Sequence, residues 1–305
     1  NFSYTFMANA VSFLISAVLV FFVPKRLGVE QYGYWQLYTL YTSYVGFFHL
    51  GWCDGVYLRY GGQDYHELEK PVFVTQFWML TAFEFLITAG LGIYGFCIVP
   101  EAEKGFILAM MGVCALLLIP RTYLGFVLQF TNRIKEYAAI TMLERVIYFV
   151  LVTALVLGGV QDYRLLLAAD LIGKAVGLVV AVCRCRDIVF GRMVPFRSGL
   201  SEAGKNINVG FKLMIANIAS LLIVGIVRMT IENKWGVATF GKVSLTMSVS
   251  NLLMVFISAV SIILFPTLRR TSDDKLAGMY DFMRTSIMTV LLGLLIFYYP
   301  AKLLL

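Results

Sequence analysis

The sequence predicts an all-α, polytopic membrane protein, a bundle of helices arranged as two six-helix lobes that are parallel repeats. Composition, a succession of long apolar runs and an internal repeat predict this fold. Hydrophobic residues make up 60% of the 305 residues, charged residues only 14%, and the mean hydropathy is +0.81. A soluble domain has about 45–50% apolar and about 25% charged residues, so lipid is the expected solvent for most of this chain.

The apolar runs follow one another with short connections. In lipid, runs of about 20 apolar residues form helices, because an open strand edge would leave backbone polar groups unpaired. We expect nine spanning helices, at about 4–23, 34–56, 72–99, 106–130, 138–158, 165–183, 207–231, 243–264 and 280–299.

The basic residues of the connections predict the orientation. Twelve Lys and Arg residues fall on the side of the N-terminus and seven on the opposite side. Cytoplasmic connections are the richer in Lys and Arg, so we expect a cytoplasmic N-terminus. The net charge of +7 then mostly faces anionic lipid, and nucleic acid is not an expected partner.

The internal repeat has a period of 208 residues. Residues 8–48 align without a gap on 216–256, with ten identities, and L-G-V-E-Q-Y-G at 27–33 aligns on W-G-V-A-T-F-G at 235–241. The glycines in these two tracts suit turns and close backbone approach: Gly28, Gly33, Gly236 and Gly241. The repeat predicts an N-lobe of six helices at 1–195 and a partial C-lobe at 196–305, truncated after about three helices.

Six spans in each lobe make the two lobes parallel, related by a pseudo-two-fold axis along the membrane normal. Transporters built from repeats place their substrate site where the halves meet, near mid-membrane, and rock one half against the other. The repeat therefore favours transport.

Four tracts carry a resemblance to a known family. They are the opening N-F-S-Y-T-F-M-A-N-A-V-S, P-K-R-L-G-V-E-Q-Y-G-Y-W-Q at 24–36, H-L-G-W-C-D-G-V-Y-L-R-Y-G at 49–61 and L-Q-F-T-N-R-I-K-E-Y-A-A-I at 128–140. They resemble polysaccharide-unit (O-antigen) flippases, of the polysaccharide transporter branch of the multidrug/oligosaccharidyl-lipid/polysaccharide exporter superfamily.

The resemblance implies twelve or more helices in the bacterial inner membrane, both termini cytoplasmic, and a central cavity that opens alternately to either side. It implies a lipid-linked oligosaccharide as substrate, carried on undecaprenyl diphosphate from the inner to the outer leaflet for lipopolysaccharide biosynthesis. Membrane lipid, a glycan polymerase and the chain-length machinery would be further partners.

Ionisable residues inside the spans are the candidate site residues, because each is costly in lipid and should face a cavity or a partner. The basic residues outnumber the acidic Glu84, Glu144 and Asp170, and guanidinium and ammonium donors suit a diphosphate. The predicted substrate-binding cations are Arg121, Arg145, Lys174, Lys212 and Arg228.

Each of these residues has a structural alternative. Arg121 follows Pro120, whose kink is typical of a cavity or a moving segment. Asp170 and Lys174 have the i,i+4 spacing of an intrahelical ion pair, and Lys212 and Arg228 have the positions of snorkelling residues.

Two carboxyls are predicted to couple transport to an ion gradient, Glu84 and Asp170. Glu84 has no charged residue within a turn on its own helix. The alternative for Glu84 is a carboxyl kept neutral by burial and hydrogen-bonded to a neighbouring helix.

Tyrosines at helical spacing in the second run, Tyr38 and Tyr41 among them, could stack on sugar rings or form an interfacial belt. The repeat-matched pairs Asn9/Asn217 and Ser12/Ser220 suit hydrogen bonding between helices, with cavity lining as the alternative.

Other function classes find less support. Five cysteines and two histidines form no metal or redox motif, no Walker motif is present, and no cofactor or catalytic activity is expected. A glycan polymerase or glycosyltransferase would need a long outer loop, which the connections do not provide. The main alternative is a cation-coupled multidrug or small-molecule antiporter of the same superfamily, and a non-transporting membrane assembly partner is a third hypothesis.

Overall fold

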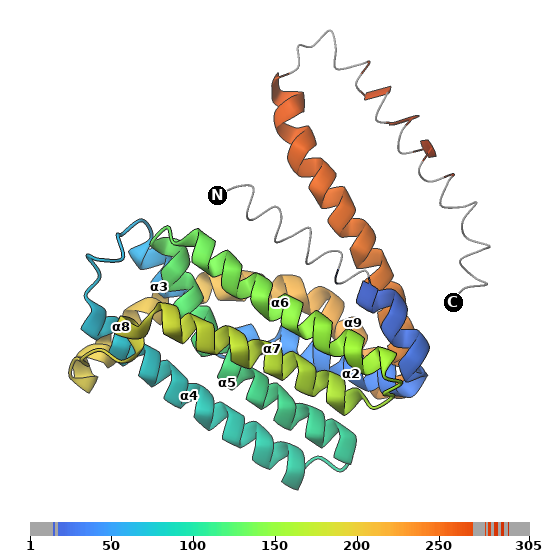
Figure 1. The fold of residues 1–305 in the computed structure, drawn as a ribbon, viewed down its shortest axis with the longest axis horizontal. Helices are drawn as coiled ribbons and strands as arrows, with labels where there is room; N and C mark the ends of the chain where they lie inside the picture. Colours follow the sequence, from blue (N-terminus) through green and yellow to red (C-terminus); the bar gives the residue numbers. More distant parts are fainter. Residues whose placement is uncertain are drawn as a thin grey trace. The chain divides into compact units, whose positions relative to one another are not determined.

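The computed structural model describes residue 15, residues 18–270 and the residues 278, 280–281, 284–285, 288–289 and 292, with backbone alone for 252–270. The described residues are helical apart from short connections (Figure 1). Five of their helices are long and apolar enough to cross a membrane. The protein is therefore a multi-pass helical membrane protein, as its composition predicts.

The elements follow one another with few residues between them. A first helical segment covers 18–27. The later elements are α2 (Val29–Ser43), the 3-10 helix η1 (Val45–Phe47), α3 (Trp52–Tyr60), α4 (Lys70–Cys97), α5 (Ala102–Phe130), α6 (Ile134–Leu157), α7 (Tyr163–Arg184), α8 (Arg186–Val189) and α9 (Phe196–Arg270).

Four of the predicted spans are confirmed as helices. The runs expected at 72–99, 106–130, 138–158 and 165–183 correspond to α4, α5, α6 and α7, with ends that differ by at most four residues. The expected span at 280–299 and most of the one at 4–23 lie outside the described residues.

The second predicted span, 34–56, is wrong as a single helix. α2 ends at Ser43, η1 follows, and α3 begins only at Trp52. Leu50 and Gly51 have φ angles of 52° and 80°, in the left-handed region that ends a helix. The Nδ1 atom of His49 accepts a hydrogen bond from the Gly51 N–H at 3.1 Å, which supports this turn.

Small residues allow the helices of the bundle to approach closely. α5 packs against α2, α3, α4 and α7 and contributes a buried face to the core. Gly95 of α4 and Gly105 of α5 lie against each other's backbone, with no room for a Cβ atom on either. On α7, Gly173 and Gly177 lie against the backbone and side chain of Glu144 in α6, in the small-xxx-small pattern of tightly packed membrane helices.

One glycine interrupts α9. Gly236 has φ 79° and ψ 171°, and the spans expected at 207–231 and 243–264 lie on either side of it. Gly28, which precedes α2, has nearly the same conformation, with φ 78° and ψ 165°. The turn geometry expected of both glycines is confirmed.

The chain divides into two compact units, 1–247 and 248–305. All contacts described below lie within the first unit. The predicted boundary between lobes at 195/196 stays a prediction.

Candidate functional site

Arg121 forms an ion pair between neighbouring helices. Its Nη2 lies 2.9 Å from Oε2 of Glu144 in α6 and donates a hydrogen bond to the Thr141 hydroxyl at 3.0 Å. Both charged side chains are largely buried, at 11% and 15% exposure. α5 continues as a helix through Pro120. The ion pair and the hydrogen bond hold Arg121 against α6.

Lys174 and Asp170 form the i,i+4 ion pair that their spacing allows. Asp170 also accepts a hydrogen bond from the Tyr38 hydroxyl of α2 at 2.6 Å. Tyr38 is only 2% exposed, so in this conformation its ring packs in the core. The pair joins α7 to α2.

Arg228 is held differently, because the described residues that contact it are neutral. Its Nη2 donates to the Gln36 Oε1 at 3.2 Å and to the Ser244 hydroxyl at 3.0 Å, and its guanidinium lies 5.2 Å from the Phe240 ring centroid. Among the described residues Arg228 has no ion pair with a carboxylate, and its buried Nε has no hydrogen-bond acceptor. Within the described part of the chain, no acid therefore neutralises this half-buried cation.

The residues around Arg228 are related by the 208-residue shift. Gln36 and Ser244 are matched positions, as are Tyr32 and Phe240. A Cβ at Gly33 would collide with the Val237 carbonyl, and a Cβ at Gly241 would lie 3.0 Å from the Val29 carbonyl oxygen. Val29 and Val237 are also matched, so the contacts between α2 and α9 are reciprocal, as at a two-fold interface.

The height of Arg228 follows from the two turn glycines. Gln36 and Ser244 each lie eight residues after a turn glycine, and Arg228 lies eight residues before Gly236. At a rise of about 1.5 Å per residue, all three lie about 12 Å from the level of the turns. Arg228 is therefore about two helical turns away from the turn at Gly236 rather than beside it.

Glu84 resembles Arg228 in having no ion pair among the described residues. Its side chain is 0% exposed, and neither carboxyl oxygen has a hydrogen-bond partner in the described part of the chain. Ion coupling at Glu84 stays a prediction.

The other predicted site residues that the structure describes are exposed or partly buried. Arg145 and Lys212 are exposed, and Tyr41 is partly buried. Asn217 and Ser220 are exposed, and the Ser220 hydroxyl donates to the Ala216 carbonyl of its own helix. Asn9 and Ser12 lie outside the described residues.

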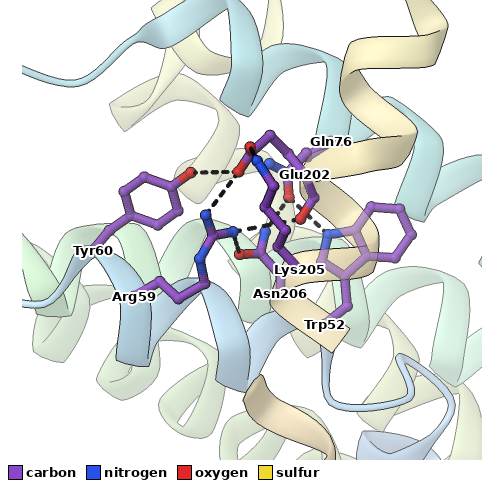
Figure 2. A network of polar contacts seen from close by, with 7 residues as sticks. All are labelled: Trp52, Arg59, Tyr60, Gln76, Glu202, Lys205 and Asn206. Carbon is purple, nitrogen blue, oxygen red and sulfur yellow. Dashed lines mark hydrogen bonds and ion pairs between the residues drawn. The ribbon is translucent and has the colours of Figure 1, made fainter. Parts of the chain in front are cut away.

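A second polar region joins α3, α4 and α9 (Figure 2). Arg59 contacts the Asn206 side-chain oxygen and forms a 2.9 Å ion pair with Glu202. Asn206 donates to the Gln76 Oε1 at 2.6 Å, and the Trp52 indole donates to the same oxygen at 2.8 Å. We call Trp52, Arg59, Gln76, Glu202 and Asn206 the α3–α9 network.

The α3–α9 network borders an open cavity of about 890 Å³. Its walls combine aromatic and charged side chains, among them Tyr60, Phe73, Arg59, Arg197 and Glu202. Beneath it, the backbones of α3 and α9 touch, because Gly51 and Gly55 face Asn206, Gly210 and Phe211.

Sequence reasoning places Ser244 and Asn206 on a small polar face of the second lobe, but it missed Gln36, the contact of Ser244 with Arg228 and the contacts within the α3–α9 network. The repeat alignment could have shown that Gln36 and Ser244 are matched polar positions in apolar runs. Lys104, at the start of α5, forms a 2.7 Å ion pair with the buried Glu232 of α9. The predicted span boundaries place both residues in connections.

The fold and its intramembrane charges define a multi-pass α-helical membrane protein. No protein-family model, curated protein or solved structure matches the chain. Its family therefore stays a prediction from the tracts described above.

Proposed function

We propose that the protein flips a lipid-linked oligosaccharide, carried on undecaprenyl diphosphate, across the bacterial inner membrane by alternating access. The proposal includes two parallel six-helix lobes and a cytoplasmic N-terminus. In that orientation, the α3–α9 network and its cavity lie at the cytoplasmic end.

One observation supports the proposal most: an arginine with no ion pair among the described residues lies where repeat-matched residues of α2 and α9 meet. Repeat-built transporters bind substrate at the interface of their halves. Arg228 contacts Gln36 and Ser244, which belong to the two repeats and lie at the same height.

The chemistry of Arg228 suits an anionic head group. A guanidinium offers planar, charge-assisted hydrogen bonds to phosphate oxygens, and such bonds are roughly twice as strong as neutral ones. The Nε of Arg228 is buried and has no acceptor in the described chain, so this donor is unsatisfied in this conformation, as is the Nε of Arg121.

The paired cations have a different role in this proposal. Arg121 and Lys174 are compensated by Glu144 and Asp170, so they hold helices together within the N-lobe. Of the five predicted cations, Arg145, Lys212 and Arg228 then carry the excess positive charge that favours an anionic substrate.

Complementation tests the proposal. The complete gene is expressed in a bacterium that lacks its own polysaccharide-unit flippase, and surface glycan is measured for Arg228→Gln and Arg228→Lys. We expect restored glycan with the unaltered protein, at least about tenfold less with Arg228→Gln, and an intermediate level with Arg228→Lys, since about 1.4 kcal/mol of lost binding is a tenfold effect.

Arg192→Gln is the matched control, because Arg192 is an exposed arginine between α8 and α9. Glycan that is unchanged by Arg228→Gln would contradict the role of Arg228. A well-expressed protein that restores no glycan with several lipid-linked units would contradict flipping itself.

Glu84 favours the second candidate, a cation-coupled antiporter of multidrug or other small molecules. A lone carboxyl inside the span is the type of group that binds a proton or a cation. Efflux of a fluorescent organic cation that is driven by a proton gradient and lost in Glu84→Gln would support this function.

A further inference from the structure

Glu84 lies at the middle of α4, fourteen residues after Lys70 and thirteen before Cys97. At about 1.5 Å per residue, about 20 Å of helix separates it from either end. Its side chain has no exposed surface. The carboxyl is therefore remote from water at both membrane surfaces.

The described residues around Glu84 offer no compensating charge. From α3, the buried thiol of Cys53 is the titratable group in electrostatic contact with it. The contacts between Gly95 and Gly105 and between Thr88 and Gly112 set the register of α4 on α5. This register brings the apolar residues Ala115 and Leu116 level with Glu84. α8 meets α4 near its first turns, where the Trp78 indole donates to the Val189 carbonyl.

A carboxyl in these surroundings is stable only in its neutral form. Moving an ionised carboxylate into an apolar interior costs several kcal/mol, and no cation or hydrogen-bond donor among the described residues offsets that cost. The neutral form needs only a proton on one oxygen.

A polar route leads from solution toward Glu84 and stops short of it. The route begins at the open cavity with Arg59 and Glu202, passes through Asn206 and reaches the fully buried Gln76 of α4 (Figure 2). The Gln76 Nε2 has no acceptor in the described chain. Gln76, Leu80 and Glu84 follow one another at i, i+4 and i+8 on the buried side of α4, and Leu80 is 0% exposed.

We propose that Glu84 is a proton-binding site, occupied in this conformation and closed to the α3–α9 network by the side chain of Leu80. Hydration past Leu80 opens the site: the O–H bond breaks, the proton passes to water at the cavity, and the carboxylate remains until it is reprotonated. A proton that binds the closed conformation more tightly than the open one stabilises the closed conformation. Protonation of Glu84 and opening of the bundle at the α3–α9 network are therefore linked. Only the further step, that this linkage drives substrate across the membrane, rests on the proposed function.

Infrared spectroscopy of the purified full protein in lipid tests the proton site directly. The carbonyl band of a neutral carboxyl is resolved from carboxylate bands, and Glu84→Gln identifies the contribution of Glu84. We expect the unaltered protein to show the Glu84 neutral-carboxyl band at neutral pH, and to lose it in alkaline solution. A Glu84 signal that is carboxylate at neutral pH would overturn the proposal.

Leu80→Asn tests the barrier without altering Glu84. Water and an amide beside the carboxyl should stabilise the carboxylate, so the neutral-carboxyl band is lost at neutral pH. Leu86→Asn is the matched control on the same helix, because Leu86 is 68% exposed, and it should keep the band. A band of equal intensity in Leu80→Asn would overturn the role of Leu80.

The test separates the two proposals. A Glu84 band with this behaviour in a protein that restores no glycan would leave the proton site standing and reject flipping. Restored glycan without the band would do the reverse.

Discussion

α9 meets the first helices of the chain at two places, and both contacts are made through glycine. At the α3 contact, Gly51 and Gly55 face the backbone of α9, and at the α2 contact Gly33 faces Val237. The charges differ. Arg59 at the first contact is paired with Glu202, whereas the acceptors of Arg228 at the second, in the part of the chain that the structure describes, are neutral.

The difference distinguishes the contacts that hold two helices together from the charged groups that can bind a ligand. Backbone contact supplies the close packing at both places. A compensated charge adds an ion pair that stabilises the contact between the helices. An uncompensated cation in a span can still bind an anionic ligand, but it lowers the stability of the protein. The predictions below test this distinction.

The largest effects should follow from adding a methyl group at the contacts. A Cβ at Gly55 would meet the Asn206 backbone, and a Cβ at Gly33 the Val237 carbonyl, both closer than van der Waals contact. We expect Gly55→Ala and Gly33→Ala each to lower the free energy of unfolding in mixed micelles by about 2 kcal/mol or more. Gly90→Ala is the control, since that glycine has nothing within 4 Å, and it should be neutral or stabilising. Equal stability of all three variants would mean that the contacts are not tightly packed.

The two arginines should respond oppositely to the same change. Arg59→Met removes donors from Glu202 and Asn206, so we expect a loss of about 1–2 kcal/mol of unfolding free energy. Arg228→Met removes an uncompensated cation, so stability should be unchanged or higher while surface glycan is lost. Thermal melting in detergent measures the first effect and complementation the second. A destabilised Arg228→Met protein would assign Arg228 to packing.

The smallest effect is expected for a single hydrogen bond at the α3 contact. Trp52→Phe removes the indole donor, but the Gln76 Oε1 keeps its bond from Asn206. We expect a loss of about 0.5–1 kcal/mol in the same melting experiment. Trp235→Phe, at a 61% exposed tryptophan, should have no effect. A loss as large as that of Arg59→Met would show that the α3–α9 network acts as one cooperative unit.

Hydropathy predicted α4 to α7 within a few residues because these helices are continuous apolar runs bounded by charged connections. It could not predict the break inside 34–56, because the backbone angles of Leu50 and Gly51 make the turn among neighbouring residues that are apolar apart from His49.

The candidate site was predictable where spacing along one helix or one hairpin decides a contact. Asp170 and Lys174 are four residues apart, and their ion pair is present. Arg121 and Glu144 lie almost equally far from the turn at 131–133, so a hairpin of two straight helices would have predicted their pairing. The contacts of Arg228 depend on how α2 and α9 pack against each other. The spacing of residues along one helix or hairpin does not predict that packing.

The reciprocal contact of Gly33 and Gly241 has a consequence for how such a chain changes over time. In a repeated sequence the two copies are free to diverge wherever each packs only against its own neighbours. Here each glycine lies against the backbone of the other copy, so a larger residue in either copy must be accommodated by the other. Glycine at both 33 and 241 is thus a joint steric requirement. The same requirement would limit the replacement of one repeat by the corresponding repeat of another protein.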